Sequence, residues 1–138
     1  MTARYLVDKS ALARMIHASV RARLAPIIEA GEAATCAIVD LEVLFSARSC
    51  DDLLEIGRRR RLAYERVPID DRVFDRALEV QAELARSGRH RVPIPDLLIA
   101  AASESASLVV LHYDRDFDTI AEVTGQAVEW VVPRGSVP

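Results

Sequence analysis

Short apolar runs alternate along the whole chain with longer segments of helical periodicity. The runs predict buried strands over Tyr5–Val7, Thr35–Ile38, Arg66–Ile69, Leu108–Leu111 and Ala127–Val132. Helices are predicted between these strands, at Leu12–Ile16, Val20–Ile28, Asp40–Phe45, Asp51–Arg61, Asp70–Ser87, Pro95–Ser103 and after Asp114. This alternation is typical of an α/β domain, so we predict three layers, α/β/α, around a central, mostly parallel sheet of about five strands.

Two predicted helices carry a clear apolar face. In the first, Leu12, Met15 and Ile16 share one side. The longest begins at Asp70 as its cap, ends at Ser87–Gly88, and has a stripe made of Val73, Phe74, Ala77, Leu78, Gln81, Leu84 and Ala85. We interpret the longest helix as structural. Because the amphipathic helices together offer more apolar faces than one sheet needs to cover, we expect the chain to dimerise.

The 138 residues form one predicted domain, 1–138, with 51% apolar and 28% charged residues, which is ordinary for a protein that buries its own core. No apolar run reaches the roughly 18 residues that span a bilayer, and no signal-peptide pattern opens the chain, so we expect a cytoplasmic protein with no membrane contact. Cys36 and Cys50 lack a metal-binding spacing and are interpreted as reduced and structural.

Four predicted apolar segments end in, or carry, a carboxylate. Asp8 follows the first strand, Glu42 lies in the helix from Asp40, Asp96 opens the apolar helix after Pro95, and Asp114 follows the strand Leu108–Leu111. A helix-capping role would explain Asp96 alone, because a carboxylate accepts from free N–H groups of the first turn. Four such placements favour convergence instead, since sites in parallel sheets form outside the carboxyl ends of the strands.

Several ionised carboxylates cannot share a semi-buried pocket unaided. Two unit charges about 4 Å apart repel by about 4 kcal/mol at an effective dielectric near 20. Protonation or a bound cation relieves this repulsion. A donor set with oxygen alone favours a hard ion, so we predict Mg²⁺, with Mn²⁺ as the other candidate, in a site that binds phosphate oxygens and activates water.

The net charge of −3 gives no general electrostatic case for nucleic acid, so the arginines are interpreted by position. Arg58–Arg61 cover more than one face of a helix, and at least one of them should face a groove, a partner or a carboxylate. Arg89 and Arg91 lie in a basic loop just before Asp96, which makes them candidates for binding RNA phosphates.

At these residues the chain resembles the PIN-domain ribonucleases, specifically the VapC-type toxins of bacterial toxin–antitoxin pairs. The resemblance covers nearly the whole chain, and it rests on the order and spacing of four segments: Asp8–Ser10, the helix that carries Glu42, Pro95–Ala101 and Leu111–Phe117. It implies a single PIN-like domain with Mg²⁺-dependent endoribonuclease activity. It also implies a homodimer that is inhibited by a cognate VapB-like antitoxin, whose C-terminal segment fills the acidic groove.

Transferred by position, the resemblance implies that Asp8, Asp96 and Asp114 are metal ligands and that Glu42 binds metal or orients the water. Ser10 would form a hydrogen bond within the site. Asp116 is an additional candidate ligand, ranked below Asp114 because residues two apart on a helix point in different directions. Two other acidic residues are interpreted as outside the site, Asp40 as a helix cap and Asp118 as solvated.

Two alternatives from other classes remain open at this point. A Mg²⁺-dependent phosphotransfer or phosphatase domain also places acidic residues at strand ends, but a haloacid-dehalogenase-like phosphatase needs an aspartate where Ser10 stands. A catalytically silent PIN-like binding module would keep the fold for partner contact, and the full acidic set argues against it. The RNA target, the antitoxin, the number of metal ions, the dimer interface and the role of Arg58–Arg61 do not follow from the sequence.

Overall fold

The computed structural model describes residues 2–138 and contains a five-stranded sheet of order β3-β2-β1-β4-β5. The strands are Tyr5–Val7 (β1), Ala33–Cys36 (β2), Glu65–Val67 (β3), Val109–His112 (β4) and Val128–Trp130 (β5). All four pairings are parallel, with Leu6 of the central strand β1 between Ala34 and Val110. The predicted parallel sheet of about five strands is confirmed.

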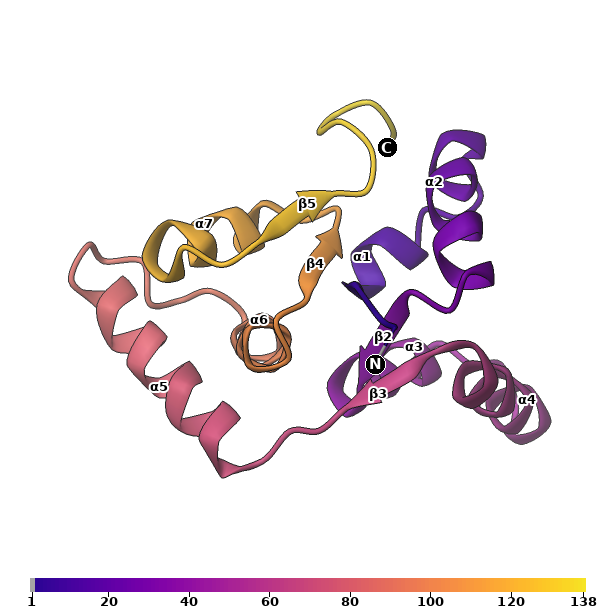
Figure 1. Ribbon diagram of the computed structural model, residues 1–138, viewed down its shortest axis with the longest axis horizontal. Helices are drawn as coiled ribbons and strands as arrows, with labels where there is room; N and C mark the ends of the chain where they lie inside the picture. The colour runs from indigo at the N-terminus through magenta and orange to yellow at the C-terminus, as the bar shows by residue number, and fades with distance from the viewer. Residues whose placement is uncertain (1) are drawn as a thin grey trace.

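Helices cover both faces of this sheet (Figure 1). They are Lys9–Leu12 (α1), Ala18–Glu29 (α2), Ala37–Phe45 (α3), Cys50–Ala63 (α4), Asp71–Ala85 (α5), Ile94–Ser105 (α6) and Arg115–Thr124 (α7). Leu6 packs in a core with α3, α5, α6 and α7, while its neighbour Val7 packs in a second core with α1 and α2. Successive residues of a strand point to opposite faces, so the two cores confirm the three-layer α/β/α architecture. Within residues 2–138, no helix has the length and apolarity needed to cross a membrane.

Helix α6 is the most deeply buried helix segment of the domain. All eight residues from Asp96 to Ser103 are buried, which explains why the sequence here is apolar on every side. Residues Ala100–Ala102 have small side chains that let neighbouring elements approach closely, and α6 packs against α3, α5, α7 and β4. Any polar side chain carried by this helix is therefore held in a low-dielectric setting, as Asp96 is.

Some sequence-predicted boundaries and faces are wrong. Strand β2 ends at Cys36, and α3 begins at Ala37 rather than at Asp40. Helix α1 ends at Leu12, so Ile16 does not share a helical face with it and is 81% exposed. On α5, Phe74 and Leu78 of the predicted apolar stripe are exposed. Periodicity identified these residues as apolar-face positions, but the tertiary packing covers only part of each face.

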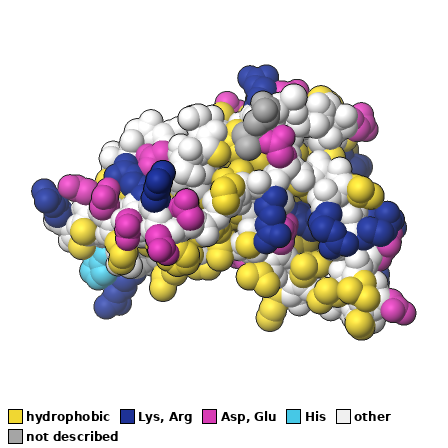
Figure 2. All heavy atoms as spheres, turned by 60° about the horizontal axis from the view of Figure 1, so that its bottom comes forward, with side chains coloured by type: hydrophobic (Ala, Val, Ile, Leu, Met, Phe, Trp, Pro, Cys, Tyr) yellow, Lys and Arg dark blue, Asp and Glu magenta, His cyan; other side chains and the backbone are white. Residues whose placement is uncertain are grey.

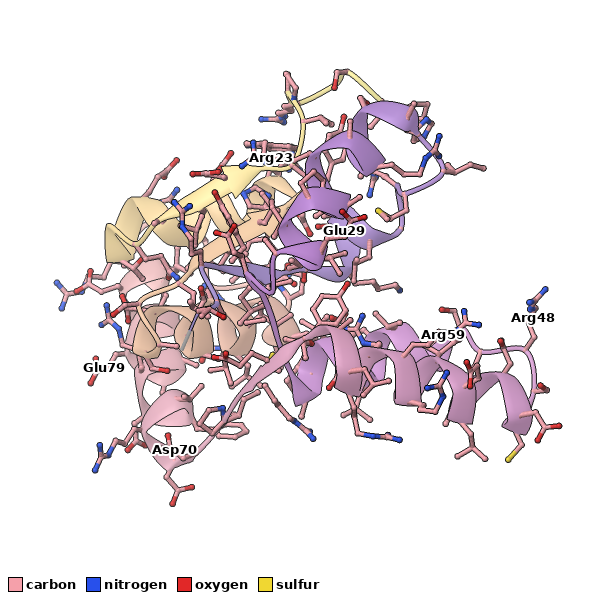
Figure 3. All side chains as sticks on the ribbon, turned by 45° about the vertical axis from the view of Figure 1, so that its right-hand side comes forward. Arg23, Glu29, Arg48, Arg59, Asp70 and Glu79 are labelled. Atoms are coloured by element: carbon pink, nitrogen blue, oxygen red, sulfur yellow. The ribbon has the colours of Figure 1, made fainter. Side chains whose placement is uncertain are left out.

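Helix α4 extends away from the sheet, with Arg59 on it and Arg48 just before its first residue (Figure 3). Its inner end is attached by Arg60, which donates from Nε to Asp40 Oδ1 at 3.0 Å and from Nη2 to Thr35 Oγ1 at 3.0 Å. Thr35 Oγ1 itself donates to Asp40 Oδ1 at 2.9 Å. The prediction that one arginine of the cluster faces a carboxylate is confirmed, whereas the prediction that Asp40 is a helix cap is wrong.

This ion pair generates a stability prediction. The Arg60 side chain is 9% exposed, so Arg60→Met should leave Asp40 without its charge partner and lower the free energy of unfolding by about 3 kcal/mol. The matched control is Arg59→Met, because the Arg59 side chain is 73% exposed and its pair with Glu55 is screened by solvent, so its loss should change stability little. Urea unfolding measures both, and equal losses would contradict the structural role of Arg60.

Candidate metal centre

Two aspartates of the site lie at the carboxyl ends of neighbouring strands. Asp8 directly follows β1 and Asp114 lies two residues after β4; because these strands are parallel and adjacent, their carboxyl ends meet at one edge. Each aspartate caps the helix that follows. Asp8 Oδ2 accepts from the Ser10 N–H at 2.9 Å, and Asp114 Oδ1 accepts from the Asp116 N–H at 2.9 Å. One oxygen of each carboxylate is thereby held in place by the backbone.

Asp96 and Glu42 approach from two helices on the same side of the sheet. Asp96 lies in the first turn of α6, after Pro93 and Pro95, and is 7% exposed. Its Oδ2 is buried and has no hydrogen-bond partner among residues 2–138, so a capping role does not explain this oxygen. Glu42 lies in the middle of α3, which packs against both α1 and α6, and its Oε1 is likewise buried without a partner.

Asp116 joins Asp96 and Asp114 in a compact cluster. One carboxylate oxygen from each of these three residues lies within 4.8 Å of the other two. The expectation that Asp114 and Asp116 point in different directions is wrong, because it assumed that both residues are helical. Asp114 is the N-cap with extended backbone angles, so its side chain folds over the first turn toward the Asp116 N–H.

The carboxylates are electrostatically coupled. Burial, and then the charges of Asp8, Asp114, Asp116 and Glu42, raise the pKa of Asp96 to about 8. Burial also raises the pKa of Asp8, against its hydrogen bonds from Ser10, and burial followed by the charge of Asp8 raises the pKa of Glu42. The pKa of Asp116 is raised by burial and by Asp114. Five carboxyl groups from four segments therefore form one acidic site.

The residues of this site fit a bound cation. Among residues 2–138 only four buried side-chain atoms lack a hydrogen-bond partner, and three are carboxylate oxygens of this site: Asp8 Oδ1, Glu42 Oε1 and Asp96 Oδ2. A buried acceptor without a partner is costly, and a cation supplies what hydrogen bonds do not. The donors are all oxygen, which suits a hard divalent ion such as Mg²⁺ or Mn²⁺.

A second layer of side chains holds Asp114 in position. Ser10 Oγ accepts from the Tyr113 N–H at 2.8 Å, and His112 Nδ1 accepts from the Asp114 N–H at 3.1 Å. Burial lowers the pKa of His112, so this fully buried ring is neutral and carries its proton on Nε2. Its Nε2 lies 3.7 Å from Asp118 Oδ1, and Asp118 Oδ2 accepts from Trp130 Nε1 at 2.9 Å.

This second layer was only partly predicted. A hydrogen bond from Ser10 within the site was expected, but His112 was not singled out. Asp118, interpreted as solvated, has a side chain that is 42% exposed and also accepts from Trp130 Nε1. The available signal was a histidine inside an otherwise apolar strand, two residues before a carboxylate. Sequence spacing alone does not reveal that Asp118 reaches back to β4 and β5.

In the basic loop before Asp96, one of the two candidate RNA-binding arginines already has partners within the protein. Arg89 forms an ion pair with Glu122 of α7 and donates from Nε to Ser87 Oγ at 2.9 Å. Arg91 is exposed and forms no ion pair with any of residues 2–138. A role for either residue in binding RNA stays a prediction.

The profile of the PIN domain family matches residues 5–123, which include all five carboxylates of the metal centre. The chain belongs to the PIN-domain family. Two relatives of this PIN-domain chain are ribonucleases VapC21 and VapC51 of Mycobacterium tuberculosis. VapC21 is 50% identical over 137 residues and VapC51 is 43% identical over 141 residues; each alignment covers 99% of this chain and 99% of the relative. The resemblance to VapC proteins stated from the motifs is confirmed.

Solved structures show the same fold. The DNA-bound VapBC complex of Salmonella typhimurium contains a chain that matches this PIN domain with a TM-score of 0.76 at 21% identity, covering 94% of this chain and 99% of that chain. VapBC-5 of Mycobacterium tuberculosis matches with a TM-score of 0.58 at 28% identity, covering 94% and 98%.

The raised pKa of Asp96 generates a pH prediction for the metal-free protein. Its folded-state value near 8 exceeds the ordinary value of 3.8, so the folded state binds the proton more tightly and its stabilising effect is lost as pH rises from about 4 to 8. The loss is at most about 1.4 kcal/mol per pH unit for one proton. Urea unfolding in EDTA should show a shallower pH slope for Asp96→Asn. Identical slopes for both proteins would contradict the coupling.

Proposed function

We propose that this PIN-domain protein is a metal-dependent endoribonuclease and the toxin of a toxin–antitoxin pair. The observation that carries the proposal is the convergence of five carboxyl groups in a partly buried site with three unpartnered oxygens. The named activity of relatives up to 50% identical over nearly the full chain supports RNA as the substrate. The reaction is hydrolysis of an RNA phosphodiester bond.

Asp8, Asp96 and Asp114 would hold the ion, with Asp116 as an additional ligand from the compact cluster. A bound Mg²⁺ or Mn²⁺ supplies charge for the phosphate oxygens and lowers the pKa of water for an in-line displacement. The backbone N–H bonds to Asp8 and Asp114 hold one oxygen of each carboxylate, which would leave the second oxygen of each to bind the ion. Glu42 is coupled to Asp8, and its unpartnered Oε1 would bind the ion or orient the attacking water.

No observation favours the alternatives. In a phosphatase-like site the residue two after Asp8 would act on the substrate, but Ser10 Oγ already accepts the Tyr113 N–H and links two loops. A silent binding module would have no reason to keep five coupled carboxyl groups in a partly buried site, because they destabilise the metal-free fold.

The cognate partner we propose is a VapB-like antitoxin, supported by the match to chains from VapBC complexes. The acidic groove is the proposed site for its C-terminal segment. A second suitable surface lies between α3 and α4, where a pocket of about 530 Å³ is lined by Leu41 and Leu44 together with Arg61 and Arg66. Figure 2 shows hydrophobic side chains gathered at this end of the molecule as well as at the α5 end.

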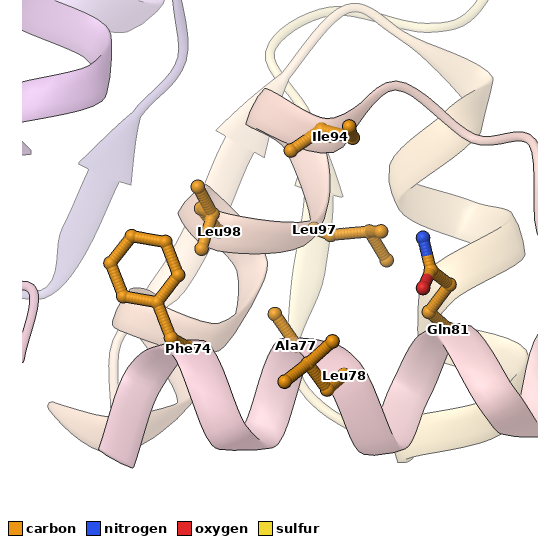
Figure 4. Close-up of a pocket in the computed structure, with 7 residues that line it drawn as sticks. All are labelled: Phe74, Ala77, Leu78, Gln81, Ile94, Leu97 and Leu98. Carbon is orange, nitrogen blue, oxygen red and sulfur yellow. The ribbon is translucent and has the colours of Figure 1, made fainter. Parts of the chain in front are cut away.

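The second apolar surface suits a homodimer. Phe74 and Leu78 of α5 and Ile94 of α6 are exposed. They line a groove of about 160 Å³, to which Leu97 and Leu98 of α6 also contribute (Figure 4). Contiguous apolar patches of this kind mark interaction surfaces in soluble proteins. An identical patch on a second copy would cover it through a two-fold axis.

The first functional prediction concerns Asp96→Asn, which keeps the shape of the side chain and removes its charge. We expect it to abolish Mg²⁺-dependent cleavage of total bacterial RNA and to reduce the rise in melting temperature that Mn²⁺ gives the wild type. Asp75→Asn, the same charge change on the exposed side of α5, is the matched control and should behave as the wild type. Undiminished cleavage by Asp96→Asn would remove the metal-centre proposal.

The second functional prediction concerns assembly. The wild type should sediment as a dimer at micromolar concentration, and Leu78→Glu should convert it to a 15.3 kDa monomer because the charge would be buried at the interface. Leu78 is 63% exposed in the single chain, so its replacement should leave folding intact. The control is Leu62→Glu on α4, where Leu62 is 77% exposed. Dissociation by Leu62→Glu but not by Leu78→Glu would place the interface elsewhere.

A further inference from the structure

One pocket of about 530 Å³ adjoins the metal centre and has a different chemical character from it. It is lined by Ser10 and Asp114 of the acidic site, together with Arg14, Tyr113, Arg115, Trp130, Arg134, Gly135 and Val137. The C-terminal tail, which contributes Arg134, Gly135 and Val137 to this pocket, runs from β5 toward α1 and α2 (Figure 1). Three guanidinium groups and two aromatic rings therefore surround a space that begins at a candidate metal ligand.

The three arginines of this pocket differ from most others in the chain. Nine of the seventeen arginines form ion pairs with carboxylates within residues 2–138, and none of those nine lines this pocket. Arg14, Arg115 and Arg134 form no such pair. Arg115 stands between Asp114 and Asp116 in the sequence and lines the pocket together with Asp114. A guanidinium group that has no carboxylate partner within residues 2–138 keeps its charge available to an external anion.

Two aromatic rings, those of Tyr113 and Trp130, line the same pocket as the three arginines. The Arg14 guanidinium carbon lies 4.4 Å from the centroid of the Tyr113 ring, and that of Arg134 lies 5.5 Å from the centroid of the Trp130 ring. The two rings meet edge to face at 5.2 Å. Planar guanidinium groups and aromatic rings are the side chains on which unstacked bases pack in proteins that bind single-stranded nucleic acid.

The pocket is preformed because the tail is tied to it. Tyr113 Oη donates to the Val137 carbonyl at 2.7 Å and accepts from the Gly135 N–H at 2.8 Å, while Arg14 Nε donates to the Pro138 carbonyl at 3.1 Å. Arg14 also donates to the Ser10 carbonyl at 2.8 Å. Arg14 is thus partly structural, whereas Arg115 and Arg134 are exposed and available to a ligand.

We propose that this pocket, made by Arg115, Arg134, Tyr113 and Trp130, binds the single-stranded RNA segment next to the phosphate that is cleaved at the metal centre. The proposal rests on the proposed endoribonuclease function and names the surface that positions the substrate. It gives the phosphate contacts to Arg115 and Arg134 rather than to Arg89, whose guanidinium is already paired with Glu122.

The chain contains a built-in reporter of this pocket, because Trp130 is its only tryptophan. A single-stranded RNA dodecamer of mixed sequence, labelled with fluorescein, is titrated into the Asp96→Asn protein, and anisotropy and Trp130 emission are recorded together. Binding at the pocket should change Trp130 emission with the same midpoint as the anisotropy. Anisotropy that rises with no change in Trp130 emission would overturn the proposal.

The variants Arg115→Gln and Arg134→Gln, combined in the same background, should reduce the slope of log affinity against log salt by about 1.4, because each phosphate contact on a single strand contributes about 0.7. The matched control is Arg72→Gln, an exposed and unpaired arginine at the start of α5 on the far side of the fold, which should leave the slope unchanged. A slope that falls with Arg91→Gln instead would assign the contacts to the basic loop and overturn the proposal.

Kinetic measurements distinguish a failure of the RNA-binding pocket from a failure of the proposed endoribonuclease function. With Asp96 intact, the Arg115→Gln/Arg134→Gln protein should cleave bacterial RNA with a raised KM and a nearly unchanged kcat, since it loses binding and keeps the metal centre. Wild-type protein that cleaves no RNA in Mg²⁺ or Mn²⁺ would remove the proposed function itself. Wild-type cleavage with an unchanged KM in the double variant would remove only the pocket proposal.

Discussion

The mutual repulsion of carboxyl groups held at one edge of the sheet is the constraint on which the rest of this structure depends. Burial and neighbouring charges raise the pKa of Asp96 to about 8, so without a cation the fold keeps this group protonated near neutral pH. A protein stabilised only for folding would place apolar side chains here. The site instead concentrates negative potential where a cation is stabilised most, at the expense of the stability of the metal-free chain.

The fold imposes this arrangement through a few rigid connections. The parallel pairing of β1 and β4 brings Asp8 and Asp114 to the same edge, and the N-terminal turns of α1 and α7 orient them. The buried helix α6 carries Asp96 into the site from the side, with no polar partner for its Oδ2. Ser10 and His112 then fix the loop after β4 by accepting from consecutive backbone N–H groups. The geometry therefore depends on backbone positions that packing holds in place.

Some arginines of the chain are paired with carboxylates and hold the structure together, whereas others are left free to bind an external anion. Arg60 lies buried against Asp40, and Arg58 and Arg59 are both bound to Glu55 on their own helix. The basic run on α4 is thus largely neutralised by internal partners. Around the C-terminal tail, by contrast, Arg115 and Arg134 have no carboxylate partner within residues 2–138, and they stand beside the acidic centre. A protein with net negative charge can in this way attract a polyanion locally.

The sequence by itself determined the fold class and the central parallel sheet, because these follow from strand-helix alternation. It also pointed to the PIN-domain family and to the acidic residues, through the order and spacing of its motifs and the carboxylates at the ends of apolar segments. Only the tertiary structure decided that Asp116 joins Asp114, that Asp40 and Asp118 are structural, and that Phe74 and Leu78 stay exposed. The physical reason is that periodicity reports which side of a helix a residue occupies. What lies opposite that side depends on long-range packing, and a residue at a helix cap leaves the periodic geometry altogether.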